Sequence, residues 1–314
     1  MRRFRMFALG ASTLALLLSA CSTGGGGSTS ASASGSQAAK PKVIVGSADF
    51  PESQIVGEIY AQALESKGFT VERKFNIGAR ALTNQALKAG QINLMPEYIG
   101  SMARELKAEA TGDAKATYDA LKVALDPIGL AALNYAPGAD QNGFVVRKET
   151  ADQFSLKTLS DVGKVANQLR WGLPSECSKN PSCGQALKDI YGIDITQVKL
   201  WKKLTACSGD MAAALTAGTP SIDIAEFCTT QPAIVQFNLV LLEDDKHSQS
   251  ADNMVPVLRK DLLDAGGADL SDTLNAVSAK LTTEQLTKMG AAVGIDHKKI
   301  EDVAKQFLDD NGLM

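Results

Sequence analysis

Short apolar runs alternate with amphipathic segments along most of this chain, and the alternation limits the folds available to it. The segment 43–46 (VIVG) is typical of a buried strand. Pro51 suits the first turn of a helix, apolar residues recur at helical spacing from Ile55 to Leu64, and Gly68 ends the run. Strands that alternate with helices in this way predict an α/β architecture with mostly parallel sheets.

The same pattern continues toward the end of the chain. We expect further strands near residues 69–75, 92–95, 130–133, 144–147, 169–172, 198–200, 222–227 and 239–242. We expect helices near residues 81–89, 113–125, 158–166, 184–191 and 210–217. The segment 271–313 is expected to be helical, with a break near residues 290–296.

A partial repeat suggests two related halves. Segments 86–93 (ALKAGQIN) and 214–223 (ALTAGTPSID) both end a helix in Ala-Leu-x-Ala-Gly and enter the next strand through a polar residue. Glycine is common after a helix, so coincidence is the alternative. We interpret the repeat as two similar α/β lobes. Ligands of open α/β sheets bind beyond the carboxyl ends of the strands, so two facing lobes would form a cleft.

The first twenty residues have the composition of a secretory signal. Arg2, Arg3 and Arg5 precede an apolar run over residues 6–18, which ends in the sequence LSA directly before Cys21. This ending resembles the bacterial lipobox, in which the cysteine is diacylated and becomes the mature N-terminus. We therefore expect a signal peptide at residues 1–20 and a lipid on Cys21. An ordinary signal peptide with an incidental cysteine is the alternative.

Residues 21–42 are expected to form a lipid-anchored flexible linker, because glycine, serine, alanine and threonine dominate the stretch and cannot bury a core. Beyond Leu18, no apolar run approaches the ~20 residues that a membrane helix needs. We expect an extracytoplasmic protein attached to the cell membrane by its lipid alone.

Charge and motifs exclude several functions. Loss of the three leader arginines would change the formal net charge from −3 to −6, which argues against nucleic acid as a partner. The motifs G-x-S-x-G, H-E-x-x-H and G-x-G-x-x-G and the Walker pattern are absent from the sequence. We expect no catalytic residues and no cofactor.

Four cysteines remain after Cys21, and in an exported chain they indicate two disulfides with three possible pairings. They are Cys177, Cys183, Cys207 and Cys228. The first two flank the turn-like dipeptide Asn180-Pro181, which favours a short-loop bridge and leaves the other two to pair. Zinc is the competing interpretation; without a C-x-x-C pair or a nearby histidine, we expect no metal site.

Several short segments resemble those of one protein family and occur in the same order as in that family. The resemblance extends over nearly all of residues 43–312. They are residues 46–53 (GSADFPES), 95–101 (MPEYIGS), 191–192 (YG), 229–230 (TT), 242–245 (LEDD) and 255–257 (VPV). The family is that of the substrate-binding proteins of glycine betaine, choline and carnitine ABC importers.

The resemblance implies a two-lobed clamshell of the type II periplasmic-binding-protein kind, with a hinge of two crossing strands. Residues 43–144 plus 255–314 would form lobe 1, and residues 145–254 would form lobe 2. The chain would be a monomer that closes on a quaternary-ammonium solute and delivers it to a membrane permease served by a separate ATPase. A sensory lipoprotein of the same fold, without a transport role, is the alternative.

The resemblance also assigns ligand contacts. Members of the family hold the ammonium head in an aromatic cage by cation–π attraction. The residues assigned here to ligand contact are Asp49, Tyr98, Ser101, Asn142, Phe144, Thr229 and Thr230.

The cage is incomplete in this chain. Cys228 occupies the third ring position, and Asp252 or a neighbour in a stretch without a ring occupies the fourth. Ala48 replaces a common lysine, and Asn180 replaces a common arginine. Other side chains could substitute, and the ones to check are Arg80, Trp171 and Trp201. Alternatively, with Asp49, Glu97, Asp140 and Asp252 nearby, the ligand is a more cationic or a neutral polar solute.

Overall fold

The computed structural model describes residues 40–314, which contain two five-stranded sheets. The expected signal peptide, the lipidated Cys21 and residues 21–39 of the expected linker lie outside the described residues. Within residues 40–314, no helix combines the length and the apolar character that membrane crossing requires.

The first sheet has the strand order β2-β1-β3-β10-β4. Its strands are β1 (Val43–Gly46), β2 (Val71–Lys74), β3 (Leu94–Tyr98), β4 (Leu130–Ala132) and β10 (Met254–Arg259). Strand β1 runs parallel to β2 and β3, whereas β10 runs antiparallel to β3 and β4.

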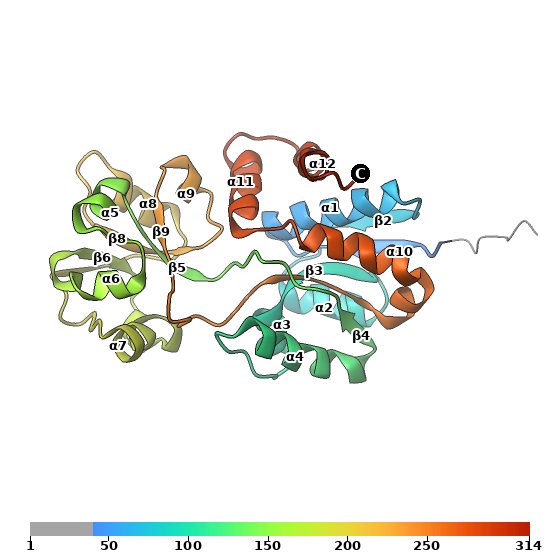
Figure 1. Ribbon diagram of the computed structural model, residues 1–314, viewed down its shortest axis with the longest axis horizontal. Helices are drawn as coiled ribbons and strands as arrows, with labels where there is room; N and C mark the ends of the chain where they lie inside the picture. Colours follow the sequence, from blue (N-terminus) through green and yellow to red (C-terminus); the bar gives the residue numbers. More distant parts are fainter. Residues whose placement is uncertain (1–39) are drawn as a thin grey trace, which may run out of the picture. The chain divides into compact units, whose positions relative to one another are not determined.

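Helices cover both faces of this sheet (Figure 1). One face packs on α1 (Pro51–Ser66), α10 (Lys260–Ser278), α11 (Thr283–Gly294) and α12 (Ile300–Asn311). The other face packs on α2 (Arg80–Lys88), α3 (Ile99–Glu105) and α4 (Ala114–Leu125). Burial on both faces explains why β1 and β3 are apolar along almost their whole length.

The second sheet has the strand order β7-β6-β8-β5-β9. Its strands are β5 (Asn142–Val146), β6 (Arg170–Leu173), β7 (Leu200–Lys203), β8 (Ile224–Cys228) and β9 (Val240–Leu242). Its helices are α5 (Lys148–Phe154), α6 (Leu159–Gly163), α7 (Ala186–Tyr191), α8 (Gly209–Thr216) and α9 (Ala233–Gln236). Each sheet has its own apolar core, so each forms one lobe.

The predicted repeat is confirmed by the matching strand orders. In each lobe the echoed segment ends a helix (α2 or α8) and leads into the middle strand (β3 or β8). The polar residue before that strand makes the same contact in both lobes: its side chain accepts a hydrogen bond from a backbone N–H of the neighbouring strand. Asn93 accepts a hydrogen bond from the backbone N–H of Ile44 at 2.6 Å, and Asp223 accepts one from that of Arg170 at 2.9 Å.

Four of the five strands in each sheet point the same way, as expected, but the one reversed strand, β10 or β5, makes half of the pairings in each sheet antiparallel. The antiparallel strands, β5 and β10, are those that the chain enters after passing from one lobe to the other. Met254 at the start of β10 pairs with Tyr98 at the end of β3, and Asn142 at the start of β5 pairs with Cys228 at the end of β8. A strand that begins where its neighbours end has to run against them.

Several elements differ from the sequence-based expectation. Helices α3 and α5 and strand β10 were not expected, and the C-terminal helices begin at Lys260 rather than near residue 271. Gly267 interrupts α10, because its φ of 57° and ψ of −149° are not helical, so α10 consists of two helical segments separated by a kink. Proline is unusual inside a strand because it has no backbone N–H to donate, but Pro256 lies within β10.

The crossing segments, residues 133–141 and 243–253, connect the lobes and pair with each other. Ala139 and Asn253 form an antiparallel bridge. The backbone N–H of Asp140 donates to the carbonyl of Asp252 at 3.1 Å. The boundary expected between residues 144 and 145 falls inside β5, which pairs along its whole length in the second sheet. The lobes therefore join through the crossing segments.

Both expected disulfides are present, between Cys177 and Cys183 and between Cys207 and Cys228, with Cα–Cα distances of 5.1 and 5.2 Å. The first closes a tight loop in which Asn180 Oδ1 accepts a hydrogen bond from the backbone N–H of Ser182 at 2.9 Å. This loop contributes Asn180 and Ser182 to the lining of a polar cavity.

Candidate functional site

A cavity of about 380 Å³ lies where the two lobes meet the crossing segments. Its lining consists of Arg104, Asp140, Gln141, Asn142, Asn180, Ser182, Cys228, Gln249, Ser250 and Asp252. No aromatic ring is among these lining residues, and all but the disulfide cysteine are polar. Such a surface holds a small polar molecule by hydrogen bonds and charge rather than by apolar contact.

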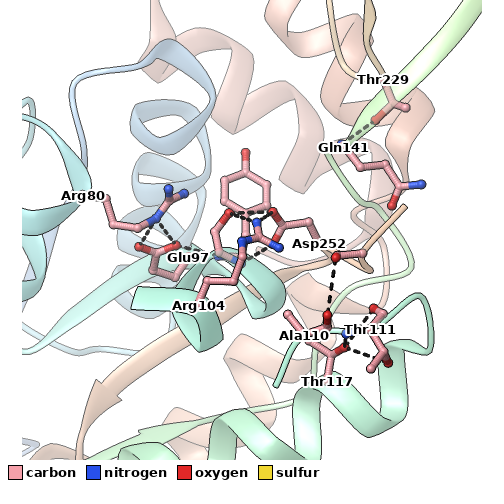
Figure 2. A network of polar contacts seen from close by, with 12 residues as sticks. Arg80, Glu97, Arg104, Ala110, Thr111, Thr117, Gln141, Thr229 and Asp252 are labelled. Atoms are coloured by element: carbon pink, nitrogen blue, oxygen red, sulfur yellow. Dashed lines mark hydrogen bonds and ion pairs between the residues drawn. The ribbon is translucent and has the colours of Figure 1, made fainter. Parts of the chain in front are cut away.

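Asp252 is the most extensively bonded carboxylate of the cavity. It is 8% exposed and accepts hydrogen bonds from the backbone N–H and the hydroxyl of Ser101, at 2.7 and 2.6 Å. Arg104 Nη2 lies 3.2 Å from Oδ2, the oxygen that also accepts from the Ser101 hydroxyl (Figure 2). The close approach of α3 depends on Gly100, since a Cβ there would lie 2.4 Å from the carbonyl oxygen of Ala251.

Tyr98, at the end of β3, is 5% exposed and packs against the ring of Phe50. Its hydroxyl donates a hydrogen bond to the carboxylate of Glu52 in the first turn of α1. The guanidinium carbon of Arg80 lies over the ring, 6.0 Å from its centroid. The aromatic face of Tyr98 therefore already makes an internal cation–π contact.

Arg80 is also an ion-pair partner. Its Nε lies 2.8 Å from Oε1 of Glu97, a carboxylate that is 3% exposed (Figure 2). Burial raises the pKa of Glu97, and the positive charge of Arg80 opposes that rise. The positive charge of Arg80 and the negative charge of Glu97 neutralise each other. Arg80 therefore does not supply the missing cation of the family's ligand site.

Three carboxyl groups gather around the Tyr98 hydroxyl and the cavity. Burial and the negative charge of Asp140 raise the pKa of Glu52 to about 7, although hydrogen bonds from Tyr98 and Thr230 oppose the rise. Burial raises the pKa of Asp140, and the negative charge of Asp252 adds a smaller rise. Burial is the main cause of both shifts and neighbouring negative charge adds to it, so an incoming positive charge would favour the ionised carboxylates.

The threonine pair after β8 contacts the crossing segment. The Thr229 hydroxyl accepts from the backbone N–H of Gln141 and donates to the carbonyl of Ala139, both at 3.1 Å. The backbone N–H of Thr230 donates to Oδ1 of Asp140 at 3.3 Å. These contacts connect the second lobe to the hinge and hold Asp140 at the cavity (Figure 2 shows Thr229 and Gln141).

The structure brings some of the expected ligand residues to the cavity and places others elsewhere. Asn142 lines it, and Ser101 contacts its Asp252. Phe144 does not line it: the ring is 1% exposed in the core of the second lobe, edge-on to Trp171 at 6.2 Å. Phe144 borders a separate cavity of about 270 Å³. Asp49 is exposed in the loop before α1.

Neither tryptophan supplies a replacement ring. Trp171 lies in the same core as Phe144, and its indole N–H donates to the carbonyl of Ala166 at 3.0 Å. Trp201 donates to the carbonyl of Leu173 at 3.2 Å, and Lys203 lies over its ring. The lining of the 380 Å³ cavity includes neither of them.

Sequence reasoning missed Glu52, Arg104 and Gln249 as residues of this region. Glu52 stands in the segment 46–53 that carries the family resemblance, one residue after a helix-starting proline, and that placement was a usable signal. Gln249 is buried and donates from Nε2 to the carbonyl of Ser182, which links the return crossing segment to the disulfide loop. Nothing local in the sequence indicates that contact.

The fold, with its polar cavity at the lobe junction, is that of a solute-binding protein. A family model described as the substrate binding domain of the ABC-type glycine betaine transport system matches residues 41–310, so the chain belongs to this family.

Individual relatives agree with this assignment. The chain is 28% identical to the carnitine transport binding protein OpuCC of Listeria monocytogenes, over 98% of this chain and 96% of that protein. It is 26% identical to the glycine betaine-binding protein YehZ of Escherichia coli strain K12, over 88% of this chain and 92% of that protein. The structure of apo YehZ from E. coli matches with a TM-score of 0.79 at 23% identity, covering 87% of this chain and 99% of that one.

The family defines the general role. The chain is a substrate-binding protein of the glycine betaine/carnitine/choline type of ABC importer, and it is not an enzyme. Its partners are a small-molecule solute and a permease, and it acts outside the cytoplasm.

Proposed function

We propose that this protein is a membrane-anchored lipoprotein that captures a small solute with a net positive charge, of the quaternary-ammonium class, and delivers it to the permease of an ABC importer. The observation that supports this charge preference most strongly is that two carboxylates, Asp140 and Asp252, line one polar cavity. Arg104 is the one cationic side chain in the cavity lining, and it lies against Asp252.

The arrangement of charge favours choline over zwitterions within that class. Glycine betaine and carnitine carry a carboxylate, which would be repelled by the carboxylates of the cavity lining. This chain also lacks the lysine and the arginine with which members of the family often bind that carboxylate. Ala48 and Asn180 stand at those positions. Choline carries an ammonium and a hydroxyl and has no negative charge. The hydroxyl suits Asn142, Asn180 and Ser182, which line the second-lobe side of the cavity.

A second candidate is a cation that has N–H donors. Carboxylates bind an N–H group through charge-assisted hydrogen bonds, whereas a trimethylammonium group offers none. The absence of aromatic rings from the cavity lining favours this candidate. Ethanolamine, a primary ammonium with the same hydroxyl as choline, separates the two possibilities.

Calorimetric titration of the purified full chain tests the proposal. We expect choline or ethanolamine to bind at least about tenfold more tightly than glycine betaine, which corresponds to about 1.4 kcal/mol. The Asp252→Asn variant should bind the cation more weakly, and Asp264→Asn, an exposed carboxylate on α10, should bind it as the wild type does. Tighter binding of glycine betaine than of either cation would contradict the charge preference.

The anchor is proposed from the leader sequence, with a lipid on Cys21 and a flexible linker up to Lys42. Labelled fatty acid should enter the wild-type protein in cells, and Cys21→Ser should abolish that labelling and release the protein from the membrane fraction. Equal labelling of both proteins would refute the lipid on Cys21.

A further inference from the structure

One disulfide is part of the cavity wall. Cys228, the last residue of β8, lines the cavity of about 380 Å³ and is bonded to Cys207, which lies in the loop before α8. Within residues 40–314, no hydrogen bond joins residues 205–208 to residues 228–231. The disulfide is therefore the bond that attaches this loop to the cavity wall.

The segment that begins at Cys228 holds three lining residues in place. Cys228, Thr229 and Thr230 each contact one of three consecutive residues that line the cavity, which are Asn142, Gln141 and Asp140. Cys228 pairs with Asn142 in the ladder between β8 and β5. The backbone N–H of Thr229 donates to the carbonyl of Gln141 at 2.9 Å, and that of Thr230 donates to Oδ1 of Asp140 at 3.3 Å. A shift of Cys228 is therefore transmitted to the cavity lining and to the first crossing segment.

The other half of the bridge has an unusual backbone. Cys207 has a φ of 55°, in the left-handed region that residues other than glycine rarely adopt. Such a conformation persists when the surrounding structure fixes it. The Ser208 hydroxyl closes the loop on itself by donating to the carbonyl of Thr205 at 2.6 Å. When the disulfide opens, the loop loses its bond to β8, and Cys207 is free to leave this conformation.

The two disulfides differ in their exposure to solvent. Cys177 and Cys183 are both 0% exposed, whereas Cys207 and Cys228 are partly exposed. Thiol–disulfide exchange requires an attacking thiolate to reach one of the two sulfurs, so a small thiol reacts first with the accessible bridge. The chain thus has one protected bridge and one accessible bridge, and the accessible one lies at the cavity.

We propose that the Cys207–Cys228 disulfide positions the second-lobe wall of the cavity, and that its reduction by a small-molecule dithiol weakens solute binding. The inference rests on the proposed function, because it concerns the affinity for the solute at the same cavity. An intact bridge keeps the wall ordered before the solute arrives, so binding does not have to order it.

The dithiol supplies the two electrons that reduction requires. One of its thiolates attacks a sulfur of the bridge, the S–S bond breaks, and the displaced cysteine thiolate takes up a proton. The second thiol of the reductant then displaces the other cysteine from the mixed disulfide. The products are two cysteine thiols and the cyclic disulfide of the reductant.

Calorimetric titration of the purified full chain with choline tests the proposal in three states: oxidised, reduced with dithiothreitol, and reoxidised. Alkylation followed by mass spectrometry identifies the cysteines that were reduced. We expect reduction of Cys207 and Cys228 to raise Kd at least about tenfold, and reoxidation to restore it. Ethanolamine replaces choline as the probe if it is the tighter ligand.

The variants separate positioning from contact and from stability. Cys207→Ser leaves the Cys228 sulfur at the cavity without a bridge, so it should bind as weakly as Cys207→Ser/Cys228→Ser, and neither should respond to dithiothreitol. Leu274→Ala removes a fully buried side chain from the α10 core of the first lobe. It lowers stability without touching the cavity, and it should keep the wild-type Kd as long as the protein is folded.

A second readout needs no solute. Amide hydrogen exchange, followed by NMR, should become at least about tenfold faster at Thr229 and Thr230 when the bridge is reduced, because their hydrogen bonds to the crossing segment open more often. Exchange on β3, in the first lobe, should stay unchanged. A general loss of stability would instead accelerate exchange in both places.

The outcomes distinguish the inference from the proposed function. Weaker binding by the reduced protein and by both cysteine variants, with Leu274→Ala unchanged, supports the inference. The same Kd in the oxidised and reduced states, or wild-type affinity of Cys207→Ser, overturns it and leaves the proposed function intact. Failure of every cation to bind the oxidised protein overturns the proposed function, and the exchange rates then still decide whether the bridge positions the wall.

Discussion

Asp252 accepts hydrogen bonds from both the backbone N–H and the hydroxyl of Ser101, at 2.7 and 2.6 Å, and so attaches the return crossing segment to α3. The same carboxylate lines the cavity and pairs with Arg104. One side chain therefore contributes both to the hinge and to the charge of the cavity, and the two contributions can be separated by substitution.

Asp252→Ala should lower the free energy of unfolding by about 2–3 kcal/mol, because the Ser101 donors lose a buried acceptor. Asp252→Asn keeps an acceptor oxygen and should cost about 1 kcal/mol, while the cavity loses a charge. Urea unfolding measures both values. Asp264→Ala on the exposed side of α10 is the control and should change the unfolding free energy by less than about 0.5 kcal/mol. Equal costs for the two Asp252 variants would refute the acceptor argument.

Gly100→Ala should disturb the start of α3. The added Cβ would lie 2.4 Å from the carbonyl oxygen of Ala251, so the helix or the crossing segment has to shift. We expect a loss of about 1–3 kcal/mol in unfolding free energy, together with weaker solute binding. Gly209→Ala in the first turn of α8 has no heavy atom within 4 Å of the new Cβ and should be neutral. Thermal unfolding of the two variants decides the matter, and wild-type behaviour of Gly100→Ala would contradict the contact.

Arg80→Met should destabilise the protein by about 3 kcal/mol, because it leaves the buried carboxylate of Glu97 without its ion pair. Glu97→Gln in the same chain removes that charge and should restore part of the loss. The double-mutant cycle, measured by urea unfolding, gives the coupling between the two residues. Additive effects of the two substitutions would show that they do not act as a pair.

Glu226 should make the protein less stable as the pH rises. The carboxyl is 1% exposed on β8, and burial, with the charge of Glu176, raises its pKa to about 7. It lies 3.1 Å from Sγ of Cys183, and a disulfide sulfur has no proton to donate, so only the protonated carboxyl can make a hydrogen bond there.

The folded protein therefore binds a proton at Glu226 more tightly than the unfolded chain does. Between the unfolded pKa of about 4.5 and the folded pKa of about 7, the free energy of unfolding falls with pH, by at most about 3 kcal/mol. Urea unfolding at several pH values should show this fall in the wild type and a smaller one in Glu226→Gln. Identical pH profiles for the two proteins would assign the dependence to other groups.

Much of the local structure could be predicted from the sequence. Hydrophobic periodicity depends on neighbouring residues, so β1, α1 and α4 appear close to their expected positions. The predicted repeat leads to the same strand order in both lobes, and the four cysteines pair as their spacing indicated. The motif segments identified the family because they combine residue types in an unusual order.

The surroundings of the expected ligand residues could not be predicted from the sequence, for a physical reason. The resemblance placed Phe144 in an aromatic cage, but alternation along β5 turns its ring toward Trp171 and the core. Tyr98 is at the expected place, but its neighbours Glu52 and Arg80 come from other elements and determine what its hydroxyl and its ring contact.

The sequence by itself determined where most helices and strands form, that the chain has two similar halves, and to which family it belongs. Only the tertiary structure decided that Asp140 and Asp252 line one cavity and that β5 and β10 run antiparallel to their neighbours. Ser101 and Asp252 are 151 positions apart, and their contact exists because the chain returns from the second lobe beside α3. Local periodicity carries no information about this return of the chain to the first lobe. The return brings charged side chains together, and those charges determine what the cavity can bind.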